Sequence, residues 1–192
     1  RIILITGAGD GIGRAAALAY AQHGATVVLL GKTVAKLEKI YDEIEAAGCA
    51  TPAIYPMHLE GATPHDYDEL ADVMESNFGR LDGILQNAAS LPYLSRIKDY
   101  EQEDWFKVIQ VNLNAPFQIT QACLPLLGKS EDACVVFTTD AVDHRGKAFW
   151  GAYGVSKFGI EGLTQILAAE LENSTIRVNC IDPGPTRTAM RK

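Results

Sequence analysis

The chain has 192 residues, of which 47% are hydrophobic, and this suits one domain with a large core. Its 24 acidic residues outnumber its 17 basic ones, and no run of lysine and arginine resembles a patch for nucleic acid or anionic membranes. No apolar run reaches the roughly 18 residues that a membrane-spanning helix needs. These properties argue against a nucleic-acid or membrane partner and favour a soluble protein that binds a small molecule.

The cysteines and histidines show no spacing typical of a disulfide framework or a metal site. Cys49, Cys123, Cys134 and Cys180 are scattered without a CxxC pair, and the four histidines form no HExxH or similar pattern. We therefore expect reduced thiols, no metal and a cytoplasmic location.

Short aliphatic or β-branched runs alternate with longer amphipathic runs along the whole chain. The short runs predict strands at Ile2–Thr6, Thr26–Leu30, Ala53–His58, Gly83–Gln86, Ala133–Thr138 and Ile176–Ile181. The longer runs predict helices at Ile12–His23, Val34–Ala47, Pro64–Phe78, Gln102–Leu127 and Tyr153–Glu172. We expect Gly24, Gly48 and Gly79 to end three of these helices. Pro116 and Pro125 are expected to kink or end the long fourth helix.

This alternation favours βαβ units and a parallel sheet with helices on both faces. Nearly all the predicted strands are too apolar to have one face in water, so we expect them to be central and buried. Right-handed crossovers then give a three-layer α/β fold, a doubly wound parallel sheet of the Rossmann type with strand order 3-2-1-4-5-6. The prediction is a single domain over residues 1–192, with ligands at the carboxyl ends of the strands.

A glycine-rich segment, Thr6-Gly-Ala-Gly-Asp-Gly-Ile-Gly13, follows the first predicted strand and leads into a helix. Gly7, Gly11 and Gly13 permit a tight turn and the close approach of a pyrophosphate, and the start of the helix presents free backbone N–H groups to it. The segment therefore predicts a nucleotide-binding site.

Tyr153 and Lys157 stand four residues apart, which places them on one face of a helix. The lysine cation favours the phenolate form of the tyrosine, so Tyr153 could exchange a proton near neutral pH. The pair therefore predicts a general acid or base.

The order and spacing of these motifs resemble the short-chain dehydrogenase/reductase family over essentially the whole chain. The resemblance rests on Thr6-Gly-x-x-x-Gly-Ile-Gly13, Asn87-Ala-Ala89, Asn112, Tyr153-x-x-x-Lys157, Arg177-Val-Asn-Cys-Ile181 and Pro183-Gly184 leading to Thr188. The segments Trp150-Gly-Ala-Tyr153 and Asn179–Arg191 further resemble the YciK-like oxidoreductases, a bacterial branch of that family.

The resemblance implies an oxidoreductase that transfers hydride between a nicotinamide cofactor and a carbonyl or alcohol. In the family, the residue matching Tyr153 exchanges the proton, the residue matching Lys157 lowers its pKa and binds the nicotinamide ribose, and the residue matching Asn112 supports a proton relay. The implied cofactor-binding residues are Gly7, Gly9, Asp10, Gly11, Ile12, Gly13, Lys32, His58, Leu59, Asn87, Ala88, Ala89, Tyr153, Lys157, Pro183, Gly184, Thr186 and Thr188.

The end of the second strand indicates which nicotinamide cofactor is used. An acidic residue there would bind the adenosine ribose and repel a 2′-phosphate, but Leu30-Gly31-Lys32 has none. Lys32 therefore favours NADP(H) over NAD(H). Asp10 is expected to hold the glycine loop or cap its helix, and His58 to make a weakened adenine contact in place of the aspartate common in the family.

The family's fourth catalytic residue is a serine thirteen residues before the tyrosine, and this position holds Asp140. An ionised carboxylate cannot donate to an oxyanion, and its charge would raise the pKa of Tyr153. Three alternatives stay open. Thr139 or Thr138 supplies the hydroxyl, a protonated Asp140 donates instead, or the protein binds NADP(H) as a regulatory or structural protein with little or no turnover.

The resemblance also bears on assembly and on the substrate region. Related proteins form dimers or tetramers through the helices that match Gln102–Leu127 and Tyr153–Glu172, so we expect a homodimer or homotetramer. Family members continue into a lid over the substrate and a final strand, and neither has a counterpart before Lys192.

Overall fold

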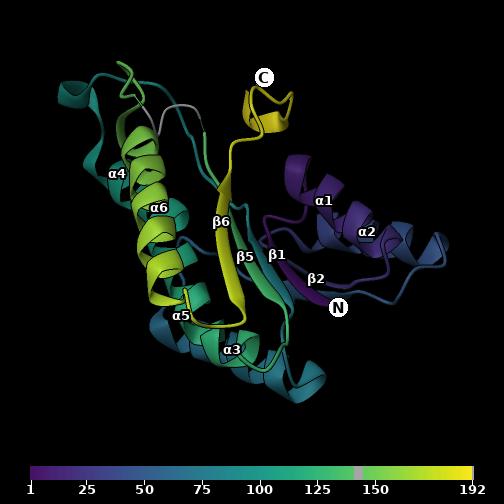
Figure 1. Cartoon of the computed structure of the whole chain (residues 1–192). Coiled ribbons are helices and arrows are strands. Elements are labelled where there is room, and N and C mark those ends of the chain that lie inside the picture. The colour runs from purple at the N-terminus through teal and green to yellow at the C-terminus, as the bar shows by residue number, and fades with distance from the viewer. Residues whose placement is uncertain (141–144, 192) are drawn as a thin grey trace.

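The protein contains one six-stranded parallel sheet (Figure 1), and the computed structural model describes residues 1–140 and 145–191. The strand order is β3-β2-β1-β4-β5-β6, which confirms the predicted order. The strands are β1 (Ile2–Thr6), β2 (Thr26–Gly31), β3 (Ala53–Pro56), β4 (Gly83–Gln86), β5 (Ala133–Thr138) and β6 (Ile176–Ile181).

Helices lie on both faces of the sheet and make a three-layer α/β fold, as predicted (Figure 1). One face carries α1 (Gly11–Gln22) and α2 (Val34–Ala46). The other carries α3 (Pro64–Phe78), α4 (Gln102–Ile109), α5 (Ala115–Leu127) and α6 (Gly151–Glu170). Gly24, Gly48 and Gly79 follow the ends of α1, α2 and α3 with positive φ angles, so the predicted helix stops are confirmed.

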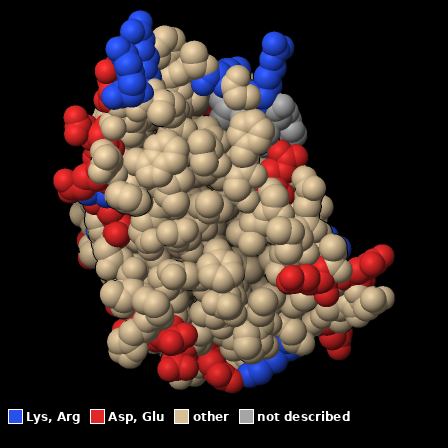
Figure 2. All heavy atoms as spheres, turned by 90° about the vertical axis from the view of Figure 1, so that its left-hand side faces the viewer, with Lys and Arg blue, Asp and Glu red and all other residues tan. Residues whose placement is uncertain are grey.

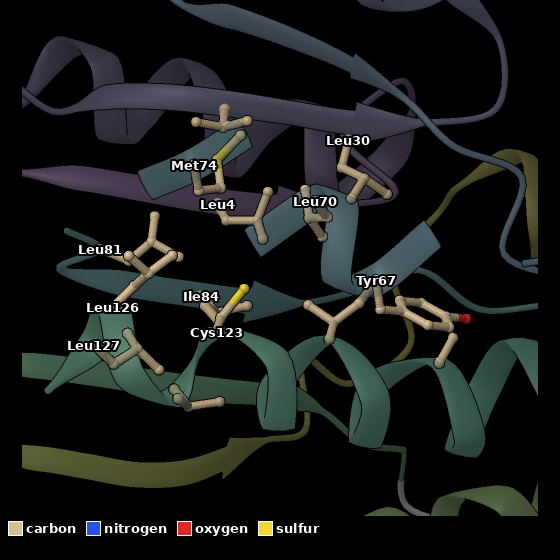
Figure 3. Packing of buried hydrophobic residues seen from close by; sticks show 14 of the residues in the cluster. Leu4, Leu30, Tyr67, Leu70, Met74, Leu81, Ile84, Cys123, Leu126 and Leu127 are labelled. Atoms are coloured by element: carbon tan, nitrogen blue, oxygen red, sulfur yellow. The ribbon is translucent and has the colours of Figure 1, made fainter. Parts of the chain in front are cut away.

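Alternate residues of the inner strands fill two separate cores. Leu4 of β1 packs into the core under α3 and α5, whereas its neighbour Ile5 packs into the core under α1 and α2. This follows from the strand geometry, because successive side chains point to opposite faces of a sheet. Figure 3 shows the first core, with side chains that include Leu4, Leu30, Tyr67, Leu70, Met74, Leu81, Ile84, Cys123, Leu126 and Leu127.

The edge strands depart from the expectation of central, buried strands. Along β6, Ile176 and Val178 are buried, whereas Arg177 between them and Asn179 after them are exposed. The expectation is wrong here because α6 packs against β6 on one face only. A strand with one face in water alternates in burial, as β6 does.

The third strand ends at Pro56, two residues earlier than predicted. Beyond it the chain turns, and the N–H of Gly61 donates to the carbonyl of His58 at 3.1 Å. His58 and Leu59 therefore lie in this turn and are not part of strand β3.

The long fourth helix, predicted over Gln102–Leu127 with a kink or an end at Pro116 and Pro125, is interrupted before Pro116. A π turn over Gln110–Asn114 separates α4 from α5, and the N–H of Ala115 donates to the carbonyl of Gln110, five residues earlier. Pro116 lies in the first turn of α5 and has no N–H to donate to the carbonyl of Asn112. Pro125 lies inside α5 and does not end it. The interruption therefore comes before Pro116 and includes Asn112, and π turns of this kind are frequent at functional sites.

No helix within residues 1–140 and 145–191 is both long enough and apolar enough to cross a membrane. In the same ranges, no group of three or more His, Cys, Asp or Glu side chains is arranged to hold a metal ion.

Asp82, just before β4, anchors the end of the sheet opposite the glycine loop. Its Oδ2 accepts from the backbone N–H of Ile2 at 2.7 Å, and its Oδ1 accepts from the Ser130 hydroxyl at 2.7 Å and pairs with Arg80 at 3.2 Å. Burial raises the pKa of this carboxyl, but the hydrogen bonds from Ser130 and Ile2 and the Arg80 charge outweigh burial and lower the pKa below its ordinary value of 3.8.

Replacing Asp82 by asparagine tests this anchor. A carboxyl with a lowered folded pKa stabilises the protein above its unfolded pKa, and the stabilisation is lost as the pH falls through the folded pKa. We expect Asp82→Asn to lower the free energy of unfolding by about 1–3 kcal/mol at neutral pH, because buried donors lose a charged acceptor. Urea denaturation should show this difference shrinking as the pH falls below 3.8 and through the lowered pKa of Asp82.

Asp72→Asn is the matched control, because it removes an exposed carboxylate from α3 and should change the unfolding free energy little. A loss of stability in Asp82→Asn that is the same at acid and neutral pH would show that the charge of Asp82 is not what stabilises the fold.

Candidate functional site

A cleft of about 470 Å³ opens at the carboxyl ends of the strands. Its walls come from segments far apart in the sequence: the glycine loop after β1, the chain after β2 and β3, the loop after β4, the end of β5, the start of α6 and the segment after β6. This is the place where ligands bind in doubly wound sheets, so the cleft is the candidate functional site.

Most residues proposed for cofactor binding or catalysis line this cleft. They are Gly7, Asp10, Gly11, Ile12, Lys32, His58, Leu59, Asn87, Ala88, Ala89, Thr139, Asp140, Tyr153, Lys157, Pro183, Gly184, Thr186 and Thr188. Three others, Gly9, Gly13 and Asn112, do not form its walls. Gly9 and Gly13 belong to the glycine loop, and Asn112 holds Ser90 of the loop after β4 in place.

The glycine loop is folded tightly against the loop that follows β4. Gly7 has a φ of +66°, and a Cβ there would lie 2.9 Å from the Cα of Ala88. A Cβ on Gly13 would lie 2.2 Å from the carbonyl oxygen of Gly7. A side chain at Gly7 would push the glycine loop away from the loop after β4. A side chain at Gly13 would clash with Gly7, so Gly13 allows the first turn of α1 to lie directly against Gly7.

Thr6 joins the same two loops by hydrogen bonds. Its hydroxyl oxygen accepts from the N–H of Asn87 at 2.9 Å and from the N–H of Ala88 at 3.0 Å. Thr6 is buried at the end of β1, so these bonds are shielded from water. The Asn87-Ala-Ala89 segment is thereby held beside the glycine loop.

Asp10 caps helix α1 and is neutralised by a lysine from α2. Its Oδ1 accepts from the N–H of Gly11 at 2.7 Å, and its Oδ2 forms an ion pair with Lys36 at 2.7 Å. Lys36 also packs against Gly9, where an added Cβ would lie 3.2 Å from the lysine Cβ. Because the cation offsets the charge of Asp10, the first turn of α1 keeps the positive end of its dipole available to an anion.

The wall of the cleft that follows β2 and β3 has both expected and unexpected residues. Lys32 is exposed immediately after β2, and Gly31 and Lys32 at this strand end carry no carboxylate. His58 lines the cleft from the turn after β3, and Glu60 from the same turn adds a carboxylate that the sequence did not single out.

Tyr153, Lys157 and Asp140 meet between the end of β5 and the start of α6. The Tyr153 hydroxyl donates to Oδ2 of Asp140 at 3.1 Å. The Lys157 ammonium lies 5.5 Å from the centre of the Tyr153 ring and donates to the carbonyl of Thr138 at 2.7 Å. Tyr153 and Lys157 are buried, 5% and 4% exposed, and Asp140 is half-buried, so water screens the effect of the cation and the carboxylate on the phenol only weakly.

The two threonines before Asp140 make other contacts. The backbone N–H of Thr139 donates to the carbonyl of Ile181 at 2.8 Å, which pairs the end of β5 with β6. The hydroxyl of Thr138 is buried and has no hydrogen-bond partner within the described ranges. Asp140, the residue after Thr139, accepts the hydrogen bond of the phenol.

Asn112 lies behind the cleft and fixes its inner wall. Its Oδ1 accepts from the N–H of Ser90 at 2.7 Å, and its Nδ2 donates to the carbonyl of Ser90 at 3.0 Å and to the hydroxyl of Ser156 at 3.1 Å. Ser156 lies one residue before Lys157 on α6. Asn112 therefore ties the loop after β4 to the helix that carries Tyr153 and Lys157.

Several cleft residues were missed by the sequence analysis. Ser90 and Val111 each stand next to a predicted residue in the sequence, so adjacency was an available signal. Ala189 and Met190 line the cleft from a short 3-10 turn at Ala189–Arg191, which ends the segment Asn179–Arg191 that carried the family resemblance, but neither residue was assigned to the site.

The chain matches a family model and several solved structures over its full length. The family model for short chain dehydrogenases matches residues 1–192. The uncharacterized oxidoreductase YciK of Escherichia coli (strain K12) is 47% identical over 191 residues, covering 100% of this chain and 75% of the relative. The resemblance to YciK-like oxidoreductases is thus confirmed.

Two solved structures have the same fold at similar levels of identity. A short chain dehydrogenase from Pseudomonas syringae superposes with a TM-score of 0.97 at 53% identity, covering 100% of this chain and 79% of that chain. A short chain dehydrogenase from Shigella flexneri 2a str. 301, complexed with NADP, superposes with a TM-score of 0.96 at 46% identity, covering 100% and 80%. With the glycine loop, Tyr153 and Lys157 all at one cleft, these matches show that the chain belongs to the short chain dehydrogenase family of oxidoreductases.

Proposed function

We propose that the protein is an NADP(H)-dependent oxidoreductase that transfers hydride between the cofactor and a carbonyl or alcohol carbon, with Tyr153 as the general acid or base. One observation carries this proposal. Tyr153 and Lys157 lie in the same cleft as the glycine loop, so proton transfer and cofactor binding share one site.

The cleft suits a dinucleotide phosphate in shape and charge. The glycine loop leaves no room for side chains between Gly7 and Ala88, and the first turn of α1 can receive a pyrophosphate. Gly11, with a φ of +52°, brings the loop against Thr188 from the segment after β6. Lys32 stands where a 2′-phosphate would need a cation. The related protein from Shigella flexneri is complexed with NADP, which supports the same cofactor here.

The bound cofactor would supply or accept the hydride, and this chain's residues would handle the proton. Tyr153 would donate its phenolic proton to the substrate oxygen in reduction or remove it in oxidation. The Lys157 ammonium would favour the phenolate and is held by the carbonyl of Thr138. Asn112 would hold the loop after β4 in a fixed position relative to α6, through its hydrogen bonds with Ser90 and Ser156.

Asp140 favours a second candidate function, an NADP(H)-binding protein with little or no turnover. The Tyr153 hydroxyl donates its hydrogen bond to this carboxylate, and a substrate oxygen would need the same proton. The carboxylate and the Lys157 ammonium also act on the phenol in opposite directions, because an anion disfavours the phenolate that the cation favours. Both effects would weaken carbonyl reduction.

A second copy of the chain would fit the outer face of α4, α5 and α6. These helices expose Phe106, Phe117, Val155, Phe158 and Ile166. Figure 2 shows a broad uncharged face on this side of the molecule, with charged residues gathered at its rim. Large exposed apolar patches with a polar rim mark interaction surfaces. We propose a homodimer or homotetramer that uses this face. A cytoplasmic location stays a prediction from the cysteine pattern.

Tyr153→Phe tests the catalytic proposal. Loss of the general acid should lower kcat/KM for carbonyl substrates by roughly 10²- to 10⁴-fold. NADPH binding, measured by fluorescence titration, should change little because the ring remains. Turnover that survives this substitution would contradict the role of Tyr153. Absent turnover in the wild type, gained in Asp140→Ser, would favour the second candidate.

Lys32→Glu tests the choice of cofactor. The new carboxylate would repel a 2′-phosphate and accept from the ribose hydroxyls, so kcat/KM should shift from NADPH towards NADH by roughly 10- to 100-fold. Lys39→Glu makes the same charge change on an exposed position of α2 and serves as the control. An unchanged cofactor ratio in Lys32→Glu would show that this lysine is only a surface cation.

Phe158→Glu tests the interface. A buried, unpaired carboxylate costs several kcal/mol, so the dissociation constant of the oligomer should rise by at least about 100-fold. Sedimentation velocity measures the species present. Val34→Glu places the same charge on α2, on the opposite side of the sheet, and should leave assembly intact. Equal oligomerisation of both variants would place the interface elsewhere.

A further inference from the structure

Asp140 places a carboxylate at the reacting end of the cleft. Its Oδ2 accepts from the Tyr153 phenol at 3.1 Å, and both residues line the cleft. The Lys157 ammonium lies 5.5 Å from the centre of the Tyr153 ring. Any substrate whose reacting atom meets Tyr153 therefore also meets the carboxylate.

This arrangement is poorly matched to a carbon–oxygen double bond. Hydride addition to a carbonyl builds negative charge on the oxygen, and an ionised carboxylate beside it raises the energy of that state. A carboxylate is also an acceptor only and cannot donate to a carbonyl oxygen. Alcohol oxidation passes through the same transition state in reverse, so it carries the same cost.

A carbon–nitrogen double bond has the opposite requirements. Its nitrogen must be protonated before the carbon accepts hydride readily, and the resulting iminium is a cation with an N–H donor. A carboxylate within hydrogen-bond distance stabilises the protonated form and binds the N–H through a charge-assisted bond. We propose that imines are a further substrate class of this cleft, with Asp140 as the catalytic residue that binds and protonates the imine nitrogen.

The proton can follow the contacts that the structure contains. The Asp140 carboxylate takes the proton of the Tyr153 hydroxyl that already donates to it and passes this proton to the imine nitrogen, which leaves Asp140 ionised beside the iminium. Tyr153 is reprotonated from solvent with the aid of Lys157. The carbon–nitrogen π bond breaks, and the imine carbon accepts hydride from the reduced nicotinamide. An imine, reduced nicotinamide and one proton thus yield an amine and oxidised nicotinamide.

The inference rests on the cofactor half of the proposed function and is tested by a matched pair of substrates. The pair is 2-methyl-1-pyrroline, a cyclic imine, and cyclopentanone, a ketone of the same ring size, each assayed with NADPH. Four proteins are compared: the wild type, Asp140→Ser, Asp140→Asn and the surface control Asp72→Asn. Asn keeps an acceptor for Tyr153 but removes the charge, and Ser supplies a neutral donor. NADPH binding to each protein is measured separately by fluorescence titration.

The wild type and Asp72→Asn should reduce the imine with a kcat/KM at least about tenfold above that for the ketone, the size expected of a hydrogen bond between charged partners. Asp140→Asn and Asp140→Ser should lose at least about tenfold on the imine, and Asp140→Ser should gain on the ketone. NADPH affinity should stay within a few-fold in all four.

Two results would overturn the inference while leaving the proposed function in place. One is Tyr153-dependent ketone reduction that equals or exceeds imine reduction in the wild type. The other is imine reduction that is unchanged in both Asp140 variants. A wild type that binds NADPH but turns over neither substrate would also overturn it and would favour the binding-protein function. Absence of NADPH binding would instead refute the cofactor assignment on which both proposals rest.

Discussion

The parallel pairing of β1 with β4, and of β4 with β5, is the constraint on which the whole site depends. Parallel strands end at the same edge, so the glycine loop, Asn87-Ala-Ala89 and Asp140 emerge side by side although more than a hundred residues separate the first from the last. Thr6 locks the first two loops together through its buried hydroxyl. Gly7, Gly13, Asn112 and helix α6 shape the site because they contact the loops at this common edge.

The chemistry of the cleft is set by two opposite charges on one phenol. In water a cation and a carboxylate at these distances would be screened, but Tyr153 and Lys157 are buried, so each charge acts strongly on the proton between them. Membership of an oxidoreductase family therefore does not by itself decide which bond this protein reduces. The proposed preference for an imine follows from the single carboxyl that lies beside Tyr153.

Most of the fold could be predicted because its signals are local. Apolar runs, the glycine turn and the helix-ending glycines depend on neighbours in the sequence, and all strands were placed within two residues. The π turn at Gln110–Asn114 could not be predicted, because it depends on Asn112 reaching Ser90 across the fold. The exposed face of β6 was missed for a similar reason: strand composition does not report which helices cover a strand.

The sequence by itself determined the family, the strand order, the residue types of the cofactor cleft and the presence of a carboxylate thirteen residues before Tyr153. It left open whether Thr138, Thr139 or Asp140 meets the phenol. Only the tertiary structure decided this, because the contact depends on how the end of β5 and the first turn of α6 are set against each other. Neither element's own sequence specifies that arrangement. A hydrogen bond of 3.1 Å between Tyr153 and Asp140 is a property of the packed fold.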